Sequence, residues 1–146
     1  MKNIFYPTHI NGQPFFLRKN YKAASGVYLI KEKGLFGRVV YVGLSTNNLY
    51  RTFYRHFQEW NDQRQVRTTY NKEDYKGRMI IIPASKIDKV EKFLIKKYKP
   101  KDNRDTEPQS KADDKQGEEN FVKYEALPFG NYTLEETFGK KKKKKK

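Results

Sequence analysis

The sequence contains no cysteine among its 146 residues, which excludes disulfide bridges, thiolate zinc sites and cysteine nucleophiles. It also has no apolar run near the ~18 residues of a transmembrane helix, and no signal-peptide core follows Lys2. We therefore expect a soluble, cytoplasmic protein with no membrane partner. The length predicts one ordinary domain, and aromatic residues at 15% supply apolar material for its core.

Acidic residues are few relative to basic ones. Lys and Arg number 32 against 17 Asp and Glu, a formal net charge of +15. Removing the C-terminal run of seven lysines leaves 25 basic residues against 17 acidic ones, so an excess of eight remains. Such an excess favours polyanionic partners through electrostatic steering and counterion release. Nucleic acid is the first partner to consider, and an anionic membrane surface is the second.

Hydrophobic patterning predicts an α/β chain with the element order β-β-α-β-α. Two β-branched and aromatic runs, Gly26–Ile30 and Arg38–Gly43, indicate a strand hairpin, and Arg78–Ile82 indicates a third, buried strand. An apolar stripe with helical spacing, opened by Asn47-Asn48, predicts a helix over about 48–60. A second helix begins near Ser85 and ends before Pro100, and residues 61–76 between them read as a long loop.

Extensions flank this predicted domain of residues 25–103. Residues 1–24 read as an irregular or hairpin-like lead-in, with Asn11-Gly12 between two apolar pieces. Residues 104–120 are almost entirely polar and read as a flexible linker, whereas residues 121–139 are apolar enough to dock back on the core. The poly-Lys tail, residues 140–146, is left out of the fold prediction.

Two features could carry chemistry. Tyr28 and Tyr41 lie on the two strands of the hairpin, where they can share one face and present two phenols to one spot. Cross-strand aromatic packing would also explain them. Glu91 stands beside the apolar stripe of the second helix, where every other charge from 89 to 99 is basic. It is either an ordinary solvated residue or a lone acid with a function.

These residues follow a known pattern. The chain resembles the GIY-YIG nucleases, which include intron homing endonucleases, some restriction enzymes and the nuclease module of a bacterial excision-repair protein. The two namesake motifs stand here as Gly26-Val27-Tyr28 and Tyr41-Val42-Gly43, and Glu91 is followed by Asn103 at the family's spacing of about twelve positions. The resemblance covers about residues 25–103, and it implies a small three-stranded antiparallel sheet flanked by helices.

The resemblance also implies roles. Glu91 would be the single protein ligand of a divalent ion, Mg²⁺ or Mn²⁺, since Mg²⁺ accepts one carboxylate plus retained waters and substrate phosphate. Tyr28 would accept the proton of the attacking water and Tyr41 would orient water or phosphate. Asn103 would close the site by side-chain hydrogen bonds. Gly26 and Gly43 would be structural members of the two motifs.

The family's arginine can be aligned in two ways. Counting from the second motif places it at Arg51. Aligning on the apolar stripe places His56 at the family's His or Tyr position and the arginine at Thr52, in which case Arg55 is a substitute guanidinium three positions further on. We retain His56, Arg51 and Arg55 as candidate catalytic residues.

Three functions remain open from the sequence. The first is a divalent-metal-dependent endonuclease or nickase that hydrolyses double-stranded DNA. The second is a catalytically weak or inactive nucleic-acid-binding module with the same fold. The third is an RNA-binding protein whose exposed aromatic residues stack on bases. The target site, the oligomeric state and any partner protein for targeting stay undetermined.

Overall fold

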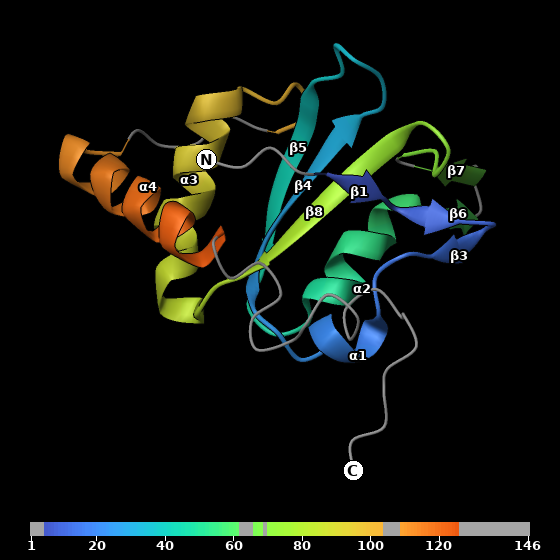
Figure 1. Cartoon of the computed structure of the whole chain (residues 1–146), viewed down its shortest axis with the longest axis horizontal. Helices are drawn as coiled ribbons and strands as arrows, with labels where there is room; N and C mark the ends of the chain where they lie inside the picture. The colour runs from blue at the N-terminus through green and yellow to red at the C-terminus, as the bar shows by residue number, and fades with distance from the viewer. Residues whose placement is uncertain (1–4, 62–65, 69, 104–108, 126–146) are drawn as a thin grey trace.

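The computed structural model describes residues 5–61, 66–68, 70–103 and 109–125, in which helices cover both faces of one antiparallel sheet (Figure 1). The sheet has the strand order β1-β8-β4-β5, with β1 at Tyr6–Pro7, β8 at Tyr75–Ile81, β4 at Gly26–Glu32 and β5 at Val39–Ser45. The predicted antiparallel sheet is therefore confirmed. It has four strands instead of three, because Tyr6 of the N-terminal extension pairs with Gly77 of β8.

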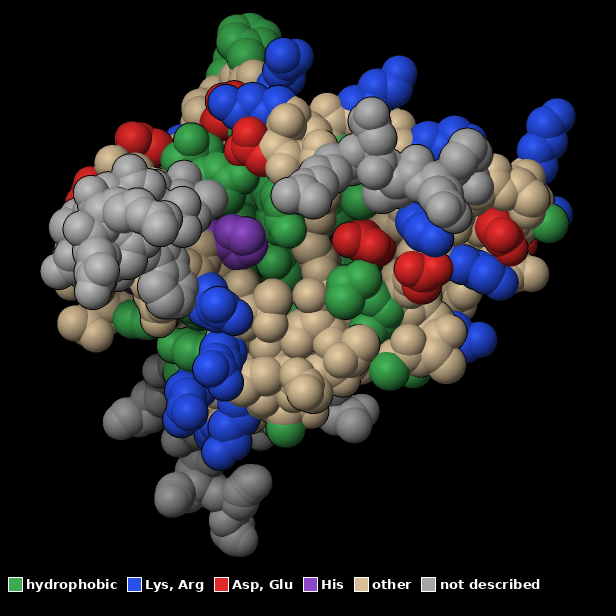
Figure 2. All heavy atoms as spheres, turned by 180° about the vertical axis from the view of Figure 1, so that it is seen from behind, with side chains coloured by type: hydrophobic (Ala, Val, Ile, Leu, Met, Phe, Trp, Pro, Cys, Tyr) green, Lys and Arg blue, Asp and Glu red, His purple; other side chains and the backbone are tan. Residues whose placement is uncertain are grey.

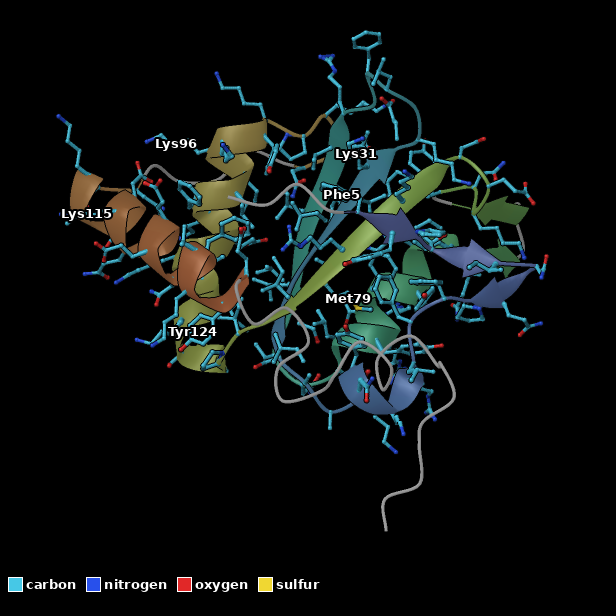
Figure 3. All side chains as sticks on the ribbon, viewed as in Figure 1. Phe5, Lys31, Met79, Lys96, Lys115 and Tyr124 are labelled. Carbon is cyan, nitrogen blue, oxygen red and sulfur yellow. The ribbon has the colours of Figure 1, made fainter. Side chains whose placement is uncertain are left out.

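The central strand β4 is buried on both faces because its apolar side chains alternate between two cores. Tyr28 and Ile30 pack with α2, Leu49–Tyr54, whereas Val27 and Leu29 pack with α3, Ile87–Tyr98. The two helices therefore lie on opposite faces of the sheet. Figure 3 shows Met79 of the neighbouring strand on the α2 side.

The first predicted helix is shorter than expected. The Asn48 side chain caps it by accepting a hydrogen bond from the backbone N–H of Arg51 at 3.0 Å, as the sequence suggested. However, α2 ends at Tyr54, and one 3-10 turn, η1 at Arg55–Phe57, completes the apolar stripe. The stripe continues through η1 because Phe57 still packs into the core, so its spacing could not reveal where the α-helix ends.

The segment expected as a loop, residues 61–76, is partly strand. β6 (Glu59–Asn61) pairs antiparallel with β7 (Val66–Thr68), and β8 already begins at Tyr75. Between β1 and β4, β2 (His9–Ile10) and β3 (Gln13–Pro14) form a hairpin, one of the two forms expected for the lead-in. Its two turn residues have positive φ, 53° at Asn11 and 80° at Gly12, which is the backbone that an Asn-Gly turn favours. A short helix, α1 at Arg18–Tyr21, follows.

A helix replaces most of the linker expected at residues 104–120. After η2 (Ala84–Lys86) and α3, the helix α4 runs over Lys111–Glu125 and packs along α3. A Cβ at Gly117 would lie 2.4 Å from the backbone oxygen of Lys89, so this glycine permits the close approach. The prediction failed because α4 contacts the domain through few apolar residues and is polar elsewhere.

Phe121 is the main apolar anchor of α4, with 1% of its surface exposed. The rest of the predicted docking segment, residues 126–139, and the lysine tail lie outside the described residues. None of the helices in the described ranges is both long and apolar enough to cross a lipid bilayer.

Candidate active site

The two motif tyrosines meet on the α2 face of the sheet. In the β4–β5 register Tyr28 is paired with Gly43 and Ile30 with Tyr41, so the two tyrosines lie two positions apart on one face. Their ring centroids are 6.0 Å apart. The sequence prediction that both phenols face the same spot is confirmed.

The two motif glycines make room for this arrangement. A Cβ at Gly43 would lie 2.3 Å from Cζ of Tyr28, so the tyrosine ring occupies the space of the missing side chain. A Cβ at Gly26 would lie 2.0 Å from the backbone oxygen of Ile80, so that glycine allows β4 to approach β8. Both glycines are therefore needed for packing.

His56 joins the tyrosine pair from η1. Its Nε2 lies 2.8 Å from the Tyr28 hydroxyl oxygen, and its ring centroid lies 4.7 Å from that of Tyr41. Burial, followed by the positive charge of Arg55, lowers the pKa of His56 to about 4. The imidazole is therefore neutral near pH 7. When Nδ1 carries the ring proton, Nε2 accepts the hydrogen bond from Tyr28.

Burial also controls the phenols. It raises the pKa of Tyr28 well above its usual range, and a hydrogen bond with Tyr41 raises it further. Burial likewise raises the pKa of Tyr41, against the effect of that same hydrogen bond. Tyr41, Tyr28 and His56 thus form a hydrogen-bonded chain, in which Tyr28 is only 2% exposed and Tyr41 is half-buried.

Glu91 lies on α3, which packs against the edge strand β5. After burial, its negative charge is a further cause of the raised pKa of both Tyr28 and Tyr41. The carboxylate is half-buried, and burial followed by the charge of Asp88 raises its own pKa, while Lys92 opposes this. The lone acid therefore lies within electrostatic reach of both phenols.

Asn103 ties the chain after α3 to the outer edge of β5. Its Oδ1 accepts a hydrogen bond from the backbone N–H of Val42, and its Nδ2 donates to the carbonyl of the same residue, both at 2.8 Å. The backbone N–H of Asp102 donates to the carbonyl of Val40 at 3.0 Å. These bonds satisfy backbone groups of an otherwise open strand edge beside Tyr41.

Sequence reasoning missed a second contact at the site. The Tyr70 hydroxyl donates to the Asp102 carboxylate at 2.6 Å, and the Tyr70 backbone N–H donates to the His56 carbonyl at 2.9 Å. The Tyr70 ring centroid lies 5.8 Å from that of His56. No pattern in the sequence joins these positions, although the place of Asp102 next to Asn103 was a weak signal.

The two candidate arginines are both exposed on the α2–η1 segment. Arg55 is the one whose charge lowers the pKa of His56. Arg51 follows the cap residue Asn48 in the first turn of α2. Thr52, at the alternative register, instead donates its hydroxyl to the Asn48 carbonyl at 3.0 Å.

A metal at this site would depend on few protein ligands. Within the described ranges, no group of three or more His, Asp or Glu side chains could hold an ion by itself. A single half-buried carboxylate whose charge acts on two neutral phenols is compatible with Mg²⁺, which retains waters and uses one or two carboxylates with substrate phosphate. Glu91 is therefore the residue that could hold it.

Comparison with known families agrees with this geometry. A model of the GIY-YIG catalytic domain matches residues 24–104, which span β4, β5, α2, β8 and α3. Searches of curated proteins and of solved structures found no match. The match covers more than half of the chain and includes both tyrosine motifs, His56, Glu91 and Asn103. The chain therefore belongs to the GIY-YIG family of nuclease catalytic domains.

Proposed function

We propose that this protein is a divalent-metal-dependent endonuclease or nickase that hydrolyses phosphodiester bonds of double-stranded DNA. The family indicates a nuclease-type function on nucleic acid in general. The observation that carries the finer proposal is the 2.8 Å contact between Tyr28 and His56, beside a carboxylate whose charge reaches both phenols.

Tyr28 and His56 act together in this proposal. Because its pKa is raised, Tyr28 is not a phenolate near pH 7. It is therefore not a base before the water attacks. It can accept the proton of the attacking water only while passing its own proton to a neighbour. The neutral Nε2 of His56 is in place to receive that proton. Afterwards His56 gives a proton back to Tyr28 as Tyr28 releases one to the leaving oxygen, because the imidazolium is disfavoured at this site.

The remaining groups bind and orient. Tyr41 is the more accessible phenol, and its hydroxyl would hold the attacking water or a phosphate oxygen at the open end of the hydrogen-bonded chain. Arg55, and Arg51 one turn before it, would place a guanidinium against the phosphate. Asn103 keeps β5, and with it Tyr41, in position.

Glu91 would bind the ion, Mg²⁺ or Mn²⁺. When bound, such an ion neutralises charge on the scissile phosphate and assists departure of the leaving oxygen. The half-buried carboxylate supplies the negative charge that draws a cation to this place, and the surrounding phenols add no positive charge to repel it.

Cleavage of supercoiled plasmid in Mg²⁺ or Mn²⁺ tests the proposal. We expect wild-type protein to nick the plasmid, and we expect Glu91→Ala and Tyr28→Phe each to lower the rate by at least ~100-fold. Asp88→Asn and Tyr124→Phe are matched controls, because they change a carboxylate on the same helix and a phenol outside the site. Both should cut at nearly the wild-type rate.

Two results would contradict the proposal. Equal traces of nicking in wild type and in all variants would identify a contaminating nuclease. DNA binding without any metal-dependent nicking would support the non-catalytic binding module instead. The burial of Tyr28 is the observation that favours this alternative.

A further inference from the structure

We propose that a strip of exposed cations on α1 and α2 is the surface along which the phosphate backbone of duplex DNA lies next to the active site. The strip, here called the α1–α2 strip, consists of Arg18, Lys19, Lys22 and Arg51. That DNA is the ligand of this strip rests on the proposed nuclease function. That the strip binds anions does not.

The charge distribution along the chain is the first support. Residues 1–58 contain nine Lys and Arg but a single acidic residue, Glu32, which lies at the far end of β4. No carboxylate therefore belongs to α1, to α2 or to η1. A phosphate chain laid over these elements meets only positive and neutral side chains of that half of the sequence.

The second support is the absence of ion pairs within the strip. Three ion pairs among the described residues involve lysines of α3: Lys89–Asp113, Lys92–Asp88 and Lys96–Asp114. None includes a member of the α1–α2 strip. Its charges are thus available to an external anion, while Lys89, Lys92 and Lys96 of α3 already have carboxylate partners.

Figure 2 shows where these charges gather. Lys and Arg side chains form a band over the region of α1 and α2 on the face seen from behind. In contrast, Lys96 and Lys115 in Figure 3 belong to the α3–α4 layer on the other side of the molecule. A groove between those two helices is lined by lysines together with Asp114 and Glu118, so its charge is mixed.

The strip is continuous with the active site. Arg18 lies near enough to Tyr50 of α2 for its charge to act on that phenol, which joins α1 to α2. Arg51 and Arg55 are four residues apart and so neighbours on one side of the segment. Arg55 in turn acts on His56, the partner of Tyr28. A backbone bound along the strip would therefore lead to the reacting groups.

Three of the four strip residues lie outside the residues that the family model matches. The family model begins at residue 24, after Arg18, Lys19 and Lys22. The helix α1 that carries them is held in place by Tyr21, which is fully buried among Phe16 and the core aromatics. The extension thus enlarges the positive surface beside a site that the matched domain already contains.

Salt-dependent binding of a labelled DNA duplex tests the strip. We compare the full-length wild type with the triple variant Arg18→Gln, Lys19→Gln, Lys22→Gln, and with the matched triple variant Lys97→Gln, Lys111→Gln, Lys115→Gln of the α3–α4 layer. Both variants remove three exposed charges. Arg51 is left intact because of its proposed catalytic role. Thermal denaturation of each variant checks that it folds.

The strip variant should bind at least ~10-fold more weakly at low salt, and its slope of log K against log salt should fall by about 2–3, since each phosphate contact contributes about 0.9. The control should lose less than one unit of slope. Equal losses in the two variants, or a strip variant that binds as wild type does, would overturn the proposal. So would a loss confined to single-stranded RNA.

The result is separable from the test of catalysis. If wild type does not nick plasmid but the strip variant alone loses duplex binding, the strip stands and the nuclease proposal fails. If Glu91→Ala stops nicking while the strip variant keeps its wild-type affinity and slope, the nuclease stands and the strip fails.

Discussion

Tyr28 owes its position to the absence of a side chain at residue 43. The ring fills the space over Gly43, and its hydroxyl is thereby held between Tyr41 and His56. A buried phenol and a buried neutral imidazole in contact are two groups that each resist ionisation. The contact therefore keeps both groups neutral at rest, so a proton taken up by Tyr28 must be passed on within the same step.

Gly43→Ala should uncouple this pair. The added methyl group would overlap the Tyr28 ring, which must turn away from His56, so we expect a loss of about 1–3 kcal/mol in unfolding free energy and at least a tenfold slower nicking rate. Chemical denaturation and plasmid nicking measure the two effects. Gly117→Ala, which crowds Lys89 where α3 packs against α4, should cost stability but leave nicking of folded protein unchanged. A Gly43→Ala protein with wild-type stability and rate would refute this account.

His56 should make the protein less stable in mild acid. Its pKa is about 4 in the folded state against 6.5 when unfolded, so the unfolded chain binds more protons between these values. Stability contributed by the neutral ring is complete above about pH 6.5 and falls as the pH drops towards 4. After allowance for the solvent that reaches the ring, we expect a loss of about 1–2 kcal/mol.

Denaturation of wild type and His56→Gln at pH 7.5, 5.5 and 4.5 measures this effect. The wild type should lose more stability over that range than the variant, because glutamine does not titrate. Parallel curves would show that His56 is not buried as a neutral ring. His9 titrates in both proteins, since burial lowers its pKa as well, and its contribution cancels in the comparison.

At the scale of elements, the edge strand β5 is held from outside by the side chain of Asn103. Its two hydrogen bonds to Val42 take the place of a missing neighbouring strand. β5 carries Tyr41, and the segment that follows α3 carries both Asn103 and Asp102. One short stretch of chain therefore supports the open side of the site.

Asn103→Ala should weaken this edge. Removing the amide leaves the N–H and C=O of Val42 without their partners, for a loss of about 1–3 kcal/mol in unfolding free energy. Amide hydrogen exchange at Val42 should speed up by a larger factor than at Leu29 in the sheet centre. Asn120→Ala removes an exposed bond to the Gln116 carbonyl and should change stability by no more than about 0.5 kcal/mol. Equal effects of the two substitutions would contradict this role.

The elements with periodic apolar residues could be predicted from the sequence, and the others could not. β4, β5, β8 and α3 bury continuous or evenly spaced apolar side chains. By contrast, β1 is two residues long and gains its place only by pairing with β8. The helix α4 exposes most of its polar side chains, so its composition resembled that of a linker.

The part of the candidate site that belongs to sequence motifs could be predicted. Tyr28, Tyr41 and His56 meet because the hairpin register and the α2 stripe place them on one face, and both patterns are visible in the sequence. The Tyr70–Asp102 bond joins positions 32 apart in polar segments, which no periodicity relates. Only the directions of their side chains can distinguish Arg51 from Arg55, and the spacing of residues in the sequence does not give those directions.

At the scale of the whole molecule, acidic side chains are unevenly distributed along the sequence. The half of the sequence that forms α1, β4, β5 and α2 is almost free of carboxylates, whereas the α3–α4 layer pairs lysines with aspartates. The charge of Glu91, in the second layer, raises the pKa of both phenols, while the charge of Arg55, in the first, lowers that of His56. Under the proposed function, a carboxylate for a cation and a positive surface for a polyanion would thus act on one substrate.

The convergence of Glu91 with the tyrosine and histidine cluster is the central claim, and addition of Mn²⁺ during NMR of the ring C–H groups tests it most directly. A paramagnetic ion held by Glu91 should broaden the signals of His56 and Tyr41 in wild type, and this broadening should disappear in Glu91→Gln. His56 signals that stay sharp in wild type, or that broaden equally in the variant, would contradict the account.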